Sequence, residues 1–158
     1  MPEFSLAVLA DQAIIARDGK ISLIGIFRSI MLRKVPLVYP RFTVAAMIRQ
    51  VDKPTKIGIE VVDLKENQVL ATLPAATFTP PRMGEDLQML VELVELPFKT
   101  FGRHEVRILV DGKVGKFIPF TVTEAQVPAM HRPGGQLRPD GPVGPAGPMR
   151  PSGPTRLA

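Results

Sequence analysis

Residues 104–122 read HEVRILVDGKVGKFIPFTV, and this stretch decides the fold class. Apolar residues occupy every second position from Val106 to Val110, and again from Ile118 to Val122. A period of two is typical of strands that bury one face. The dipeptide Asp111-Gly112 between the two runs favours a tight hairpin turn. The stretch therefore predicts two antiparallel strands joined by a short turn.

The same alternation recurs upstream, and helical periodicity is hard to find. A second Asp-Gly pair, Asp18-Gly19, predicts a hairpin in which both turn positions take a positive φ. The segment from Pro36 to Pro40 is expected to be a connection. The expected strands, about eight in number, cover residues 4–10, 21–26, 41–49, 57–61, 69–73, 87–96, 104–110 and 118–122. Short strands at this spacing predict an all-β fold, an antiparallel immunoglobulin-like sandwich.

Composition divides the chain into two parts. Residues 126–158 hold eight of the 17 prolines and six of the 13 glycines, with few large apolar groups to offset the entropy of ordering. From Arg138 onward, proline recurs at every third position, as in a polyproline II helix. A collagen-like stalk is disfavoured because Arg138 and Arg150 occupy positions that a triple helix reserves for glycine. We expect a β-sandwich domain over residues 1–125 and a disordered, basic Pro/Gly-rich tail over 126–158.

The chain of 158 residues contains no cysteine. Disulfides and thiolate metal sites are therefore excluded, and a reducing compartment is favoured. Glu3 stands where a secretory signal carries positive charge, and the first apolar run ends at Asp11 without a cleavage pattern. No window approaches the roughly 18 consecutive apolar residues of a membrane span. We expect a soluble, cytoplasmic protein without a membrane partner.

The formal net charge of +5 raises the question of an anionic partner. Residues 1–125 hold 16 basic and 14 acidic residues, so most of the excess lies in the tail, which favours weak, salt-sensitive attraction. Aromatic residues interleave with one basic cluster, a mixture that suits single-stranded nucleic acid, although the same aromatics continue strand patterns. Anion binding is therefore an alternative function, with nucleic acid disfavoured. Its candidate residues are Arg28, Arg33, Lys34 and Arg41.

The sequence offers little material for catalysis. His104 is the one histidine of residues 1–125, and we expect its ring to be partly exposed at the start of a strand. No serine lies in a nucleophile elbow, and no phosphate-binding glycine loop or metal-ligand spacing is present. We expect no metal, no cofactor and no catalytic residue. An enzyme is the second alternative, and it predicts a pocket that brings His104 next to a carboxylate.

Two predicted strands are apolar on both faces, namely residues 41–49 and 87–96. One sheet of a sandwich turns only one face to the core, so apolar residues on the other face need a cover. This pattern favours a non-catalytic protein-interaction or accessory module, with self-association as its simplest form and another protein as the other possibility. The candidate partner-binding residues are Ala45, Met47, Leu90, Val94 and Leu96.

Short motifs add a resemblance to a known family. They are Leu9-Ala10-Asp11, Asp18-Gly19-Lys20, Ile24-Gly25-Ile26-Phe27, Pro97, Gly102 and Ile108-Leu109-Val110-Asp111-Gly112. Together they resemble a family of small bacterial proteins known only as a domain of unknown function, over roughly residues 4–123. The resemblance implies a bacterial origin and a sandwich-like domain. It implies no activity and assigns no catalytic residue.

Overall fold

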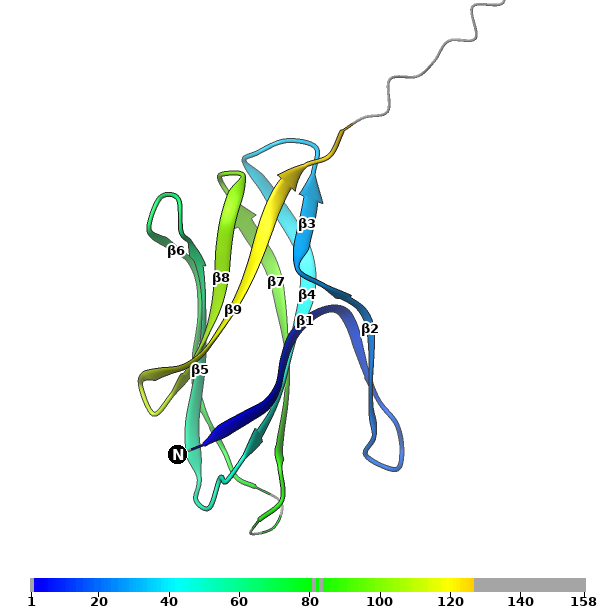
Figure 1. Cartoon of the computed structure of the whole chain (residues 1–158), viewed down its shortest axis with the longest axis vertical. Coiled ribbons are helices and arrows are strands. Elements are labelled where there is room, and N and C mark those ends of the chain that lie inside the picture. The colour runs from blue at the N-terminus through cyan, green and yellow to red at the C-terminus, as the bar shows by residue number, and fades with distance from the viewer. Residues whose placement is uncertain (1, 81, 83, 127–158) are drawn as a thin grey trace, which may run out of the picture. The chain divides into compact units, whose positions relative to one another are not determined.

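The computed structural model describes residues 2–80, 82 and 84–126, and this part of the chain contains nine strands and no helix (Figure 1). The tail predicted over residues 126–158 therefore lies, but for its first residue, outside the described residues. None of the described elements is a helix with the length and apolar composition of a membrane span. The strands are β1 (Glu3–Ile15), β2 (Ile21–Phe27), β3 (Ser29–Leu32), β4 (Leu37–Arg49), β5 (Thr55–Asp63), β6 (Gln68–Phe78), β7 (Leu87–Phe98), β8 (Gly102–Val110) and β9 (Lys113–Glu124).

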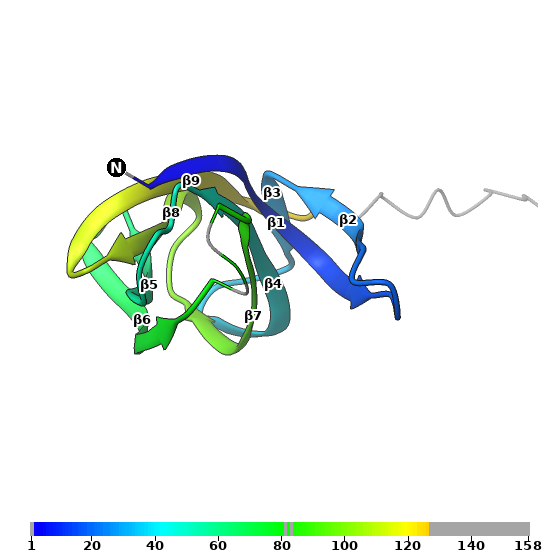
Figure 2. The same ribbon diagram turned by 90° about the horizontal axis from the view of Figure 1, so that it is seen from below.

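The strands form two sheets, which confirms the all-β prediction. One sheet has four strands in the order β2-β1-β4-β7, and the other has five in the order β3-β9-β8-β5-β6. The view along the strands shows the two layers with the core between them (Figure 2). Every pairing is antiparallel except that of β3 with β9, which is parallel.

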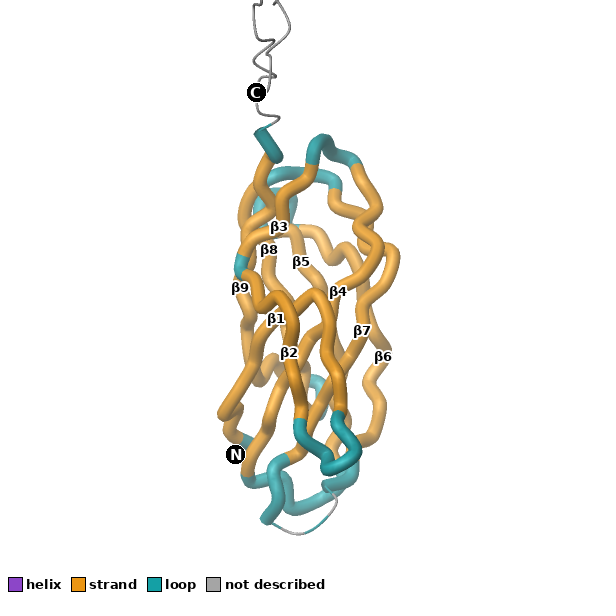
Figure 3. The backbone as a smooth tube through the Cα atoms, turned by 90° about the vertical axis from the view of Figure 1, so that its right-hand side faces the viewer, coloured by secondary structure: helices purple, strands orange, loops and turns teal. Residues whose placement is uncertain are grey.

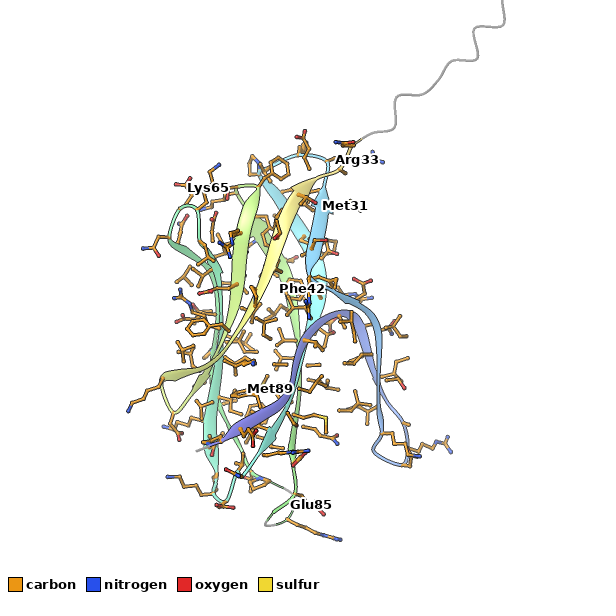
Figure 4. All side chains as sticks on the ribbon, viewed as in Figure 1. Met31, Arg33, Phe42, Lys65, Glu85 and Met89 are labelled. Atoms are coloured by element: carbon orange, nitrogen blue, oxygen red, sulfur yellow. The ribbon has the colours of Figure 1, made fainter. Side chains whose placement is uncertain are left out.

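The core takes alternate residues of β4 and β8 and of the first part of β7, as the alternation predicts. Phe42 and Met89 from the four-stranded sheet are fully buried and lie between the sheets (Figure 4). Phe42 packs edge-on against Phe120, with ring centroids 6.1 Å apart, and Phe98 lies 6.0 Å from the same ring. Burying aromatic rings of this size is a main source of stability, because each removes a large apolar area from water.

The two Asp-Gly turns differ from one another. Asp111 and Gly112 have φ values of 49° and 82°, as a two-residue turn of this type requires. At the Asp18-Gly19 turn, both residues were predicted to have a positive φ. That prediction was wrong for Asp18, because of the two only Gly19 has a positive φ, of 82°. The Gly19 N–H donates to the Ala16 carbonyl at 2.9 Å, which closes a three-residue loop.

The sequence prediction missed β3 and placed the start of β4 too late. Residues 37–40 belong to β4 and pair with the end of β7, although Pro40 has no partner in the register. Proline lacks the N–H that a ladder position needs, so a strand can pass through it only with a local irregularity. β3 has four residues, too few for alternation to mark a strand.

Candidate functional site

The outer face of the four-stranded sheet has small side chains at its centre. The register sets Thr43 between Ala10 of β1 and Glu92 of β7, while Ala45 lies opposite Leu90. Ala10, Thr43 and Ala45 are 0%, 7% and 2% exposed, although the core lies on the opposite face of the sheet. The centre of this face is therefore a low floor, because three small side chains lie there with almost no exposure.

A hollow of about 430 Å³ opens on this floor. Leu90 and Ile24 contribute apolar walls, while Arg41 and Glu92 form an exposed ion pair across β4 and β7, with Nη1 and Oε1 3.3 Å apart. Its complete lining consists of Asp11, Gln12, Ala13, Ile15, Ile24, Arg41, Thr43, Leu90 and Glu92. A shallow hollow that mixes apolar walls with the charged groups of Asp11, Arg41 and Glu92 can seat protein side chains and align polar groups beside them.

The structure places four of the five predicted partner-binding residues on this outer face. Val94 is 59% exposed, Leu90 and Met47 are half-buried, and Ala45 belongs to the floor. Leu96 was also predicted to bind a partner. That prediction was wrong, because Leu96 is 1% exposed and belongs to the core. Glu95 has a φ of 52°, which breaks the alternation after Val94 and turns Leu96 inward.

The β1–β2 hairpin carries a second apolar surface that sequence reasoning did not select. The hairpin projects away from the rest of the sandwich (Figures 1 and 2). Its four isoleucines Ile14, Ile15, Ile24 and Ile26 are between 46% and 63% exposed. A sequence signal was available, since the consecutive Ile14 and Ile15 place an apolar side chain on each face of one strand. We call these four residues the isoleucine hairpin surface.

The basic candidates are exposed but do not form an aromatic-lined platform. Arg33 lies near one end of the sandwich in the β3–β4 connection, next to Lys34 in sequence (Figure 4). Arg28 lies between β2 and β3, whereas Arg41 is in β4 and pairs with Glu92. The nearby aromatic residues belong to the interior, because Phe42 is 0% exposed and the Phe27 ring packs against it at 5.5 Å.

His104 is buried, so the prediction of a partly exposed ring was wrong. Its ring packs between Phe98 and Phe120, with centroids 5.4 and 5.5 Å away. The Nδ1 atom lies 3.0 Å from the Gly102 carbonyl, which can only accept, so Nδ1 is the donor. Nε2 has no hydrogen-bond partner and lies 3.8 Å from Oδ2 of the buried Asp63.

Asp63 is held by hydrogen bonds at the end of β5. Its Oδ2 accepts from the Thr100 hydroxyl at 2.6 Å, and its Oδ1 accepts from the backbone N–H groups of Lys65 and Glu66 at 2.8 and 3.2 Å. Burial alone raises the pKa of the Asp63 carboxyl, but these hydrogen bonds, together with the neighbouring His104, outweigh it and hold the pKa below its ordinary value. The carboxylate therefore closes the β5–β6 turn rather than facing solvent.

The histidine–carboxylate pair lacks the access that catalysis needs. Both side chains are almost completely buried, at 0% and 1% exposure, and neither lines a described pocket. A cavity of about 820 Å³ opens elsewhere and is lined by residues that include Phe4, Val51 and Val114. Within the described part of the chain, no group of three or more potential metal-ligating side chains is gathered.

Comparison with known proteins identifies a family and similar solved structures. The model of DUF6941, a family of unknown function, matches residues 5–123. No curated protein matches. Among solved structures, the Pseudomonas fluorescens alkylpurine DNA glycosylase AlkC, bound to DNA containing an abasic site analog, is 14% identical with a TM-score of 0.46. That alignment covers 61% of this chain and 28% of the glycosylase, and we draw no conclusion from it.

Proposed function

Because this chain belongs to DUF6941, a family whose description assigns no activity, we propose its function from the surfaces that the fold presents. The protein is a non-catalytic protein-interaction or accessory module that binds its partner through the outer face of the four-stranded sheet. The observation that supports this proposal is the hollow on this face, where the apolar side chains of Leu90 and Ile24 lie beside Arg41 and Glu92. The exposed side chain of Val94, opposite Arg41 in the register, continues the apolar surface. Non-obligate protein interfaces commonly combine apolar side chains with charged and polar groups in this way.

Among the described residues, the position of His104 supports assigning no catalytic role to the domain. An enzyme would use His104 with a neighbouring carboxylate, and Asp63 is such a neighbour. Yet no substrate could reach either group without opening the sandwich, because both are sealed under Phe98, Phe120 and the β5–β6 turn. The pair acts as a structural element that joins β5 to β8.

We also propose how the nine strands correspond to those of a known sandwich fold. We place the domain in the immunoglobulin-like class, in which the second and fifth strands pair in one sheet while the third, sixth and seventh pair in the other. β4 and β7 would be the first set, and β5, β8 and β9 the second. The parallel pairing of β3 with β9 supports this correspondence, because it lets one chain segment cross from the first sheet to the second.

The absence of cysteine favours a reducing compartment, so we assign the protein to the cytoplasm. Binding of nucleic acid or other anions is the less favoured function. Arg41 already pairs with Glu92, and the rings of Phe27 and Phe42 pack against each other rather than offering stacking surfaces.

The experiment compares full-length variants of the outer face with a control on the other sheet. Leu90→Lys and Val94→Lys each place a charge at the border of the floor. Val69→Lys, on the exposed side of β6, is the matched control because Val69 is 47% exposed and lies in the five-stranded sheet. Each variant is immobilised, exposed to extract of the native host, and the retained proteins are quantified by mass spectrometry.

We expect the same specific protein to be retained by wild type and Val69→Lys and lost by both outer-face variants. Thermal unfolding followed by circular dichroism verifies that all variants are folded. The substitutions at the exposed Val69 and Val94 should change stability by less than about 0.5 kcal/mol. Identical retention by all four proteins would contradict the proposal. The partner is then repurified and its affinity measured directly against each variant.

A further inference from the structure

The connections at one end of the sandwich carry an excess of positive charge. The register sets the start of β4 beside the end of β7, and the end of β5 beside the start of β8. The β3–β4, β5–β6 and β7–β8 connections therefore lie at the same end, where Figure 4 shows Arg33 and Lys65. Five exposed cations belong to these connections or follow them directly: Arg33, Lys34, Lys65, Lys99 and Arg103. We call these five residues the basic end.

The cations of the basic end are not neutralised by their own domain. None of the five forms a salt bridge within the described part of the chain. Two exposed carboxylates, those of Glu66 and Glu124, lie among them. The β4–β5, β6–β7 and β8–β9 connections at the other end have the opposite excess, with Asp52, Glu85, Asp86 and Asp111 against Lys53 and Arg82. A domain polarised in this way directs its basic end toward an anionic partner.

The chain also leaves the domain at the basic end. β9 ends at Glu124, and the Ala125 N–H donates to the Leu32 carbonyl at the end of β3, at 2.8 Å. The sequence that continues from there, residues 126–158, holds four arginines and one aspartate. An elongated anionic partner therefore meets positive charge on two consecutive parts of the chain, which favours it over a small anion.

Exposed apolar side chains accompany these cations. Leu64 precedes Lys65 in the β5–β6 turn and is 38% exposed, while Met31 lies two positions before Arg33 and is 72% exposed (Figure 4). We propose that the basic end binds an acidic segment of a partner protein, in which carboxylates are interspersed with apolar side chains. Protein interfaces commonly combine both kinds of contact. The inference goes beyond the outer-face function, because it assigns a second surface that shares no residue with the first.

The two carboxylates of the basic end favour a protein segment over a phosphate polymer or a lipid surface. Glu66 and Glu124 would meet like charge on a uniformly anionic partner, which is unfavourable. A peptide instead can place a neutral or basic residue opposite each of them. Single-stranded nucleic acid would also use exposed rings for stacking, whereas Phe98 and Phe120 are buried and Phe101 packs half-buried against the core.

The test uses the full chain and a labelled peptide in which Glu and Leu alternate. Fluorescence anisotropy measures its dissociation constant, and a peptide with Lys in place of Glu is the control for charge. We expect the acidic peptide to bind at least about tenfold more tightly than the basic one, and to bind more weakly as salt rises.

Charge reversal locates the binding surface. Arg33→Glu/Lys65→Glu should weaken binding of the acidic peptide about tenfold, because each change replaces an attraction with a repulsion. Lys53→Glu/Lys113→Glu is the matched control, since it reverses two exposed cations at the other end, and it should change the dissociation constant by less than about twofold. Circular dichroism verifies that both double variants are folded. Equal weakening in the two double variants, or no preference for the acidic peptide, would overturn the inference.

Competition separates the classes of anionic partner. Unlabelled acidic peptide, poly-dT and phosphatidylserine vesicles are each titrated against the bound labelled peptide. We expect the acidic peptide to displace it at the lowest concentration of negative charge. More effective displacement by poly-dT or by the vesicles would overturn the inference and assign the basic end to nucleic acid or to a membrane. Leu90→Lys, which tests the outer face, should not weaken peptide binding, so the two proposals fail separately.

Discussion

His104 Nε2 lies 3.8 Å from Asp63 Oδ2 inside the sandwich, so the last residue of β5 and the third residue of β8 meet as buried polar groups. Asp63 also anchors the β5–β6 turn and the residue Thr100 that precedes β8. Removing one partner of a buried polar group is costly because the other partner stays desolvated. The pair is therefore a buried polar group beside the rings of Phe98 and Phe120.

Asp63→Asn should lower the free energy of unfolding by about 2–3 kcal/mol, because an amide cannot accept from Thr100 and from both turn N–H groups at full strength. Urea unfolding followed by fluorescence or circular dichroism measures the change. Asp52→Asn, at an exposed position between β4 and β5, is the control and should change stability by less than about 0.5 kcal/mol. Equal values for the two variants would contradict a structural role for Asp63.

Stability should fall on acidification through Asp63. Its pKa is lower in the folded protein than the value of about 3.9 expected for the unfolded chain, so the unfolded state binds more protons between these two values. The stabilisation is therefore complete above about pH 5 and is lost progressively as pH falls through the folded pKa. Urea unfolding between neutral and acidic pH should show a shallower acid decline for Asp63→Asn than for wild type. Parallel declines would exclude this linkage.

Phe98→Ala should cost about 3–5 kcal/mol, since it empties a fully buried site between Tyr39, His104 and Phe120. Phe117→Ala is the matched control, because that ring is 52% exposed and lies 6.0 Å from the Arg107 guanidinium. Its cost should stay below about 1 kcal/mol. Thermal and urea unfolding measure the free energy of unfolding of both variants. An equal loss in Phe98→Ala and Phe117→Ala would contradict a core role for Phe98.

Gly25→Ala should cost about 1–2 kcal/mol, more than Gly19→Ala. Both glycines have positive φ, at 67° and 82°, but a Cβ at Gly25 would meet the Asp11 carboxylate, whereas a Cβ at Gly19 has open space. Removing the obstacle in Asp11→Ala/Gly25→Ala should bring the cost down to that of Gly19→Ala. Urea unfolding measures all three, and no recovery in the double variant would show that Asp11 moves aside freely.

The strand pattern could be predicted because alternation is a local property of the chain. The hairpin at Asp111-Gly112 and the outward side of Val94 both followed from it. It failed where the backbone departs from a regular strand. The positive φ of Glu95 reversed the expected side of Leu96, and no composition signal marks such a bulge.

The environment of His104 could not be predicted because it depends on contacts between distant residues. Asp63 lies 41 positions earlier, and only the pairing of β5 with β8 brings the two together. The parallel β3–β9 pair was missed for the same reason, since Ser29 and Thr121 become neighbours only in the folded chain. Alternation indicates which side chains of a strand face the core. It does not indicate which buried polar groups of different strands will lie side by side.

The first and last strands of the domain bear on how it would respond to mechanical force. β1 begins near one end of the sandwich and β9 ends at the other (Figure 3). Tension applied between these two points acts along the axes of both strands. β9 is bonded to β8 on one side and to β3 on the other, so its hydrogen bonds share the load instead of opening one at a time. The short parallel strand β3 therefore acts as a second attachment against pulling.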